Sequence, residues 1–180
     1  MKTMAASPTA VLLSVYHIRT YPLMIANSLS ILLSGVLALA GLVHLAWAFG
    51  STFPYANQQA LARAVVGRRG ITHMPSMAAS AFVAFCLLAA SVWALLLGRV
   101  IVVPVSDWLV ATGGLALAGV FLFRGIIGVM PTFEHALPEQ PFLRLNRRFY
   151  SPLCVLIGLA FLGLTLAMPN WAWRISLLGL

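Results

Sequence analysis

Acidic residues are scarce in this sequence, which has 3 aspartates and glutamates among its 180 residues. Paired carboxylates often carry general acid–base catalysis, and carboxylates are also common ligands of metal ions. Three acidic residues, all between positions 107 and 139, leave little material for either arrangement. We therefore expect no metal site and no enzyme that works through paired carboxylates.

Redox and catalytic motifs are missing as well. The two cysteines, Cys86 and Cys154, lie far apart and form no C-x-x-C pair, so redox and zinc chemistry have no support. We expect each cysteine to be a small apolar packing residue. The sequence also lacks a nucleophile-elbow serine, a zinc-protease helix, a phosphate-binding loop and a dinucleotide fingerprint. These absences argue against enzymatic activity.

Long apolar runs are the main feature that is present, since 62% of the residues are hydrophobic and only 8% are charged. A helix needs about 20 apolar residues to cross a bilayer, and the runs lack the alternation of a membrane barrel. The sequence therefore predicts an all-α fold, a polytopic transmembrane four-helix bundle over residues 23–180, with residues 1–22 as a short N-terminal interfacial segment. The expected spans are about 23–49, 75–97, 107–130 and 151–168.

The basic excess, 11 lysines and arginines and a formal charge of +8, has a simple explanation in a membrane protein. Each basic residue beside a membrane gains about 1 kcal/mol from anionic lipids. We therefore expect lipids with anionic head groups as partners, and no nucleic acid. The connections 50–75 and 131–150 carry six arginines, against four basic residues on the other side. This bias predicts cytoplasmic connections and outside termini, in a bacterial inner membrane.

Arg124 is the most informative polar residue, because charged residues inside a span are costly and usually face the bundle interior or an aqueous cavity. Gly125 and Gly128 follow it and leave space beside the helix. Arg124 is either an anchor for an anionic head group, since arginine offers a planar fork of donors, or a side chain that snorkels to the interface. Both interpretations stay open.

His44, near the end of the first span, falls at the same membrane face as Arg124 in a four-span topology. Ala40, Gly41 and Ala48 surround it with small side chains. A histidine here can ligate a metal, haem or pigment, or move a proton. We favour a hydrogen bond within the bundle and predict no cofactor, with haem or pigment binding through His44 as the alternative.

Tyr150 and Ser151 lie at the same face, where the fourth span is expected to begin. Ser151 is either a nucleophile near Arg147 and Arg148, or the N-cap of a helix with Pro152 in its first turn. We favour the N-cap, because serine and proline are common at these two positions.

Three short motifs in order resemble a family of small bacterial four-span membrane proteins with a domain of unknown function. The resemblance covers about residues 30–168 and implies a four-helix membrane bundle, but no activity, cofactor or catalytic residue. It also implies that the family's characteristic face includes His44, Trp47, Arg124, Tyr150 and Ser151. With Arg148 added, these are our candidate residues for binding a ligand or partner. The motifs are His44-x-x-Trp47-x-x-Gly50, Arg124-Gly125-x-x-Gly128 and Arg148-x-Tyr150-Ser151-Pro152-Leu153-Cys154.

Two functions fit these observations. The first is a non-catalytic accessory or assembly subunit packed against other subunits of a larger membrane complex, which the small size and long apolar faces favour. The alternative is a small membrane enzyme or binding protein for a lipid, quinone or isoprenoid, with the polar head near Arg124 and His44. A transporter is disfavoured, because no span carries the polar stripe that lines an aqueous path.

Overall fold

The computed structural model describes residues 8–168, and side chains from residue 24 onward. All regular elements in this part of the chain are helices, and four of its segments are long and apolar enough to span a membrane: 24–48, 77–97, 107–127 and 142–166. The predicted all-α four-helix membrane bundle is confirmed. The identity of the membrane and the orientation of the chain stay predictions.

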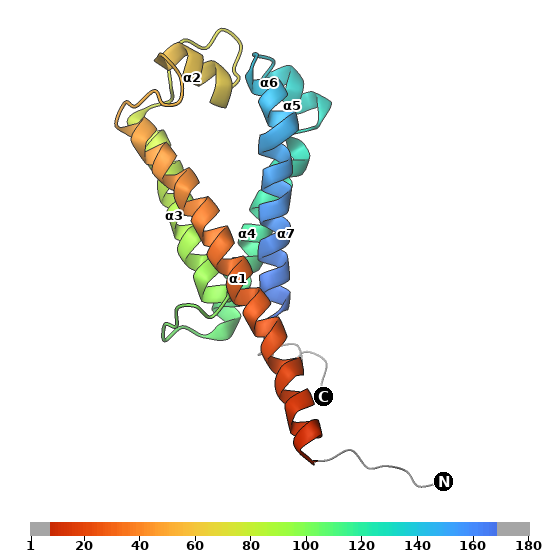
Figure 1. Cartoon of the computed structure of the whole chain (residues 1–180). Helices are drawn as coiled ribbons and strands as arrows, with labels where there is room; N and C mark the ends of the chain where they lie inside the picture. The colour runs from red at the N-terminus through yellow and green to blue at the C-terminus, as the bar shows by residue number, and fades with distance from the viewer. Residues whose placement is uncertain (1–7, 169–180) are drawn as a thin grey trace.

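The first helix, α1 (Pro8–Ala48), is continuous. The expected boundary after residue 22 therefore lies inside one helix (Figure 1). The location of residues 8–22 at a membrane interface stays a prediction. Residues 1–7 and 169–180, which belong to the expected interfacial segment and bundle, lie outside the described residues.

The long helices form two antiparallel pairs. Helix α1 packs along α3 (Met77–Leu97), and α4 (Asp107–Ile127) packs along α7 (Ser151–Leu166). In the first pair, the hydroxyl oxygens of Ser34 and Ser91 are 2.9 Å apart. In the second, a Cβ on Gly125 would lie 2.9 Å from the carbonyl oxygen of Ser151. Small residues thus allow close contact of the helix backbones in both pairs.

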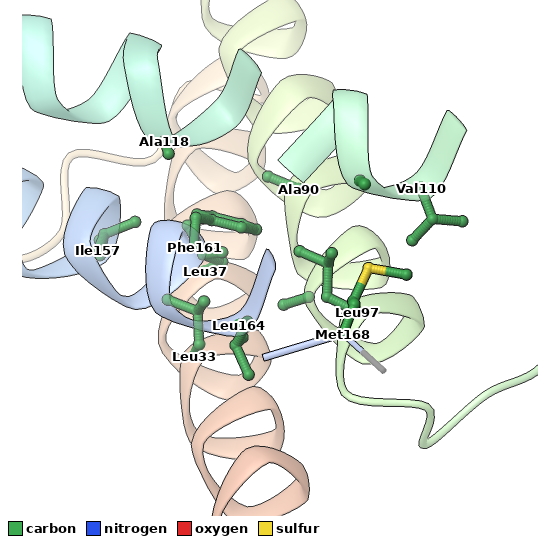
Figure 2. Packing of buried hydrophobic residues seen from close by; sticks show 12 residues of the cluster. Leu33, Leu37, Ala90, Leu97, Val110, Ala118, Ile157, Phe161, Leu164 and Met168 are labelled. Atoms are coloured by element: carbon green, nitrogen blue, oxygen red, sulfur yellow. The ribbon is translucent and has the colours of Figure 1, made fainter. Parts of the chain in front are cut away.

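The hydrophobic core joins the two pairs in the half of the bundle away from the long connections. Leu37 of α1 and Phe161 of α7 are completely buried in it (Figure 2). Phe161 also stacks on Phe121 of α4, with ring centroids 5.9 Å apart. Toward the long connections the two pairs separate (Figure 1). The core cluster comprises Leu33, Leu37, Ala90, Ala94, Leu97, Val110, Ala111, Ala118, Ile157, Phe161, Leu164 and Met168.

The fourth span begins earlier than predicted, and the prediction that Ser151 is an N-cap is wrong. Before α7 the chain is already helical in α6 (Phe142–Leu145) and in a π-helical turn, η1 (Asn146–Tyr150). Ser151 has helical backbone angles and donates its hydroxyl to Asn146 instead. A wider π turn lets the helix continue up to Pro152, which has no N–H to complete an ordinary α turn.

Two shorter helices lie in the long connections. Helix α2 (Gln58–Val65) follows α1, and α5 (Pro131–Ala136) follows α4. Both lie with α6 at the end of the bundle where the helix pairs separate (Figure 1). Asn57 caps α2 by accepting a hydrogen bond from the amide of Ala60, 2.9 Å away. Leu61, Ala62 and Ala64 form its buried face.

Candidate functional site

Arg124 points into the protein, near the end of α4. Its Nη2 donates to Oδ1 of Asn146 at 3.0 Å, and its guanidinium carbon lies 5.0 Å from the centre of the Phe133 ring. Its Nη1 is buried and has no hydrogen-bond partner among the described residues. The Arg124 guanidinium is thus held among neighbouring side chains. A snorkelling arginine would instead extend toward the membrane interface.

Arg124 also has no carboxylate partner within the described chain. The sequence contains three acidic residues, and the structure pairs each of them with a different arginine. Arg124 therefore lies beside a neutral amide and an aromatic ring, with no acidic side chain of the described residues to neutralise it. The three ion pairs are Arg63–Glu139, Arg99–Asp107 and Arg147–Glu134.

Asn146 is the centre of the hydrogen-bond network. Its side chain is completely buried, and Oδ1 accepts from both Arg124 and the hydroxyl of Ser151, the latter at 3.2 Å. Its Nδ2 donates to the carbonyl of Gly128 at 2.5 Å. The sequence analysis missed Asn146. The available signal was an amide side chain just ahead of an apolar span, where polar side chains bond between helices.

Gly128 makes room for this network. A Cβ at this position would lie 2.2 Å from the Ser151 hydroxyl and 2.5 Å from Nη1 of Arg124. Both distances are shorter than any ordinary contact. The glycine is thus required by the close approach of Arg124 and Ser151.

A series of aromatic rings extends from Arg124 to Tyr150. The Phe133 ring, which lies against the Arg124 guanidinium, is 6.3 Å from the Phe142 ring, and Phe142 is 6.2 Å from the Tyr150 ring. The Tyr150 hydroxyl donates to the carbonyl of Ala64 in α2 at 3.3 Å. Tyr150 therefore links this region to α2, and does not contact Arg124 directly.

Two carboxylates hold the surrounding connections. Glu139 accepts from the amide of Gly70 at 2.8 Å and from Arg63 at 3.1 Å, and these bonds, the Gly70 bond first, lower the pKa of Glu139. Glu134 accepts two hydrogen bonds from Arg147, which lower the pKa of Glu134. Both carboxylates are therefore stabilised in their charged form.

His44 and Trp47 lie toward the same end of the bundle as Arg124, but on the other helix pair. Nδ1 of His44 donates to the carbonyl of Ala40 at 2.8 Å, because a carbonyl oxygen can only accept. Nε1 of Trp47 donates to the carbonyl of Phe53 at 2.7 Å. The two rings are 4.7 Å apart, and within the described residues nothing joins them to Arg124.

The candidate residues thus fall into separate groups. Arg124 and Ser151 meet through Asn146, whereas Arg148 is exposed and lies against the ring of Phe149, 5.8 Å from its centre. In the part of the chain that the structure describes, no three histidine, cysteine or acidic side chains gather as metal ligands. Haem or pigment binding through Nε2 of His44 stays a hypothesis.

Comparison with known proteins supports the resemblance found in the motifs. Residues 37–161 match a family described as a protein of unknown function, DUF3995. The chain belongs to the DUF3995 family. No curated protein and no solved structure matches it. The predicted membership of an uncharacterised family of membrane proteins is therefore confirmed.

Proposed function

We propose that this DUF3995 protein binds an anionic amphiphile of the membrane, with the anionic head at Arg124. The observation that supports this is the unneutralised guanidinium inside a membrane-spanning helix, with Nη1 buried and without a partner in the described chain. A charged residue inside a span is costly and usually pairs with other groups. A bound anion offsets part of this cost.

The chemistry of the site favours a carboxylate or a phosphate. The planar fork of a guanidinium matches two oxygens of such a group, and the bonds are strengthened by the charges. One arm of the fork, Nη2, is already bonded to Asn146, so Nη1 is the donor left for a ligand. The hydroxyl of Ser151 donates its single proton to Asn146, so it orients this amide and leaves Nη1 as the donor for the ligand.

The apolar surroundings favour a ligand with a hydrocarbon tail. Phe123 and Ile126 flank Arg124 on α4 and are exposed, as are Leu153 and Leu156 on α7. Such faces suit acyl chains as well as partner helices, so we rank the accessory-subunit hypothesis second. A lipid or a fatty acid supplies both the tail and the anionic head.

Native mass spectrometry of the purified protein tests the proposal. The protein is placed in mixed micelles with equal amounts of phosphatidylglycerol, oleate and phosphatidylcholine, and retained adducts are compared between variants. We expect Arg124→Gln to lose at least tenfold of the anionic adducts, while Arg144→Gln, at an exposed arginine of the same end, keeps them. Equal retention by the two variants would overturn the proposal.

The same measurement separates the two sources of the anion. Retention of phosphatidylglycerol alone indicates a phosphate head, and retention of oleate alone indicates a carboxylate. Should Arg124→Gln unfold, Asn146→Asp gives a second route, because it places a carboxylate beside Arg124 that competes with the ligand. We expect it to reduce both anionic adducts, and undiminished adducts on this variant would contradict the proposal.

A further inference from the structure

The connection after α1 binds to the opposite helix pair. We call residues 57–70 the α2 segment. It lies between α1 and α3 in the chain, yet its polar contacts reach the connection between α4 and α7. Glu139 carries most of them: its amide donates to the carbonyl of Gly67 at 3.2 Å, and its carboxylate binds Gly70 and Arg63. The α2 segment thus bridges the two helix pairs at the end where they separate (Figure 1).

The α2 segment also covers the aromatic rings beside Arg124. Gly67 has a positive φ of 73°, and a Cβ there would lie 2.1 Å from Phe142, so the Phe142 ring lies directly against this turn. Phe142 in turn contacts Phe133, the ring that lies over the Arg124 guanidinium. Moving the α2 segment away therefore uncovers Phe142, the neighbour of the ring that lies over Arg124.

The α2 segment is held by the buried apolar face of α2 and by a weaker polar attachment. The Arg63–Glu139 pair lies at the surface, with 47% of the Arg63 side chain exposed, and exposed ion pairs contribute little to stability. Gly67 and Gly70, at the end of the segment, both have positive φ values. The hydrophobic core that joins the helix pairs lies in the other half of the bundle and does not depend on this contact.

We infer that the α2 segment is a gate over the Arg124 site, and that Glu139 is the latch that keeps it closed. This inference rests on the proposed function. In the described state Nη1 of Arg124 is buried, so a head group reaches it when the α2 segment moves off Phe142. The latch then controls how fast the amphiphile enters and leaves, more than how tightly it binds.

Hydrogen–deuterium exchange measures the gate without a ligand. The amides of Gly70 and Glu139 both donate across the contact, so their exchange reports opening. We expect Glu139→Ala to speed exchange of residues 67–71 at least fivefold. The matched control Glu134→Ala, which breaks the other ion pair of the connection, leaves it unchanged. Equal exchange in wild type and Glu139→Ala would overturn the latch.

A cross-link tests the link between the gate and binding. Arg63→Cys and Glu139→Cys are introduced in a chain with Cys86→Ala and Cys154→Ala, and joined by a short thiol-reactive cross-linker. After dilution into phosphatidylcholine micelles, the loss of phosphatidylglycerol adducts is followed by native mass spectrometry. We expect the cross-link to slow this loss at least tenfold relative to the same variant without cross-linker.

The outcomes distinguish the two proposals. If Arg124→Gln loses the adducts but the cross-link leaves the release rate unchanged, the gate is wrong and the binding proposal stands. If Arg124→Gln keeps the adducts, the binding proposal is wrong. The gate over that site is then wrong as well, even if the exchange experiment shows that the α2 segment moves.

Discussion

Arg124 and Asn146 are joined by a hydrogen bond of 3.0 Å from guanidinium Nη2 to amide Oδ1, which connects α4 to the π turn before α7. A neutral amide orients the guanidinium but does not neutralise it. In a low-dielectric surrounding an unneutralised charge is costly, whereas the same charge beside an anion is stabilised. This pair is therefore the reason to place an anion at this end of the bundle.

Replacing Asn146 should destabilise the protein. Asn146→Ala removes the acceptor for Arg124 and Ser151 and the donor to the Gly128 carbonyl, leaving buried polar groups without partners. Each such loss costs about 1–3 kcal/mol, so we expect a decrease of at least that size in the free energy of unfolding in micelles. Gln58→Ala, at an exposed position, should change it little. Equal stability of both variants would show that the network contributes nothing.

Gly128, the C-cap of α4, should be far less tolerant of a methyl group than Gly119, which lies within α4. A Cβ at Gly128 would meet Ser151 and Arg124, while a Cβ at Gly119 has no atom within 4 Å. We expect Gly128→Ala to lose about 1–3 kcal/mol of stability. Gly119→Ala should gain up to about 1 kcal/mol, because alanine favours the helix. Thermal unfolding in detergent compares the two, and the reverse order would contradict the described packing.

Attachment of the α2 segment should weaken at low pH. Contacts with Gly70 and Arg63 lower the pKa of Glu139, so the attachment is complete above the ordinary carboxyl pKa and is lost as the pH falls through the lowered one. Arg63 and Arg69 are the charged groups that act on this carboxylate. After correction for intrinsic rates, exchange of the Gly70 amide should rise below that pH. If exchange of the Gly70 amide in Glu139→Ala still depends on pH to the same extent, a group other than Glu139 causes the pH dependence.

His44→Ala should leave anion binding unchanged. His44 lies on α1 and bonds its own helix, whereas the Arg124 network lies between α4 and the last span. Retention of phosphatidylglycerol by His44→Ala should match wild type in native mass spectrometry. A loss as large as that of Arg124→Gln would mean that both residues hold the same head group, as the lipid-binding hypothesis from the sequence supposed.

The sequence was enough to predict four membrane-spanning helices and the end of the bundle where polar residues gather. Both follow from local properties: apolar runs of membrane-spanning length, and the positions of Arg124 and Tyr150 relative to them. It was not enough to show that His44 and Arg124 lie on different helix pairs, since four spans can pair in several ways. Asn146 was missed because two of its three partners, Gly128 and Arg124, are 18 and 22 residues away. Ser151 was misassigned because a π turn extends the helix ahead of it.

Retention of anionic lipids by the wild type and two arginine variants tests most directly whether Arg124 binds an anionic head group. Wild type, Arg124→Gln and Arg144→Gln are compared in the same mixed micelles, and phosphatidylglycerol and oleate retained by the folded protein are counted by native mass spectrometry. The account predicts at least a tenfold loss of anionic adducts in Arg124→Gln only. Equal retention in all three proteins would show that Arg124 does not bind an anionic head group.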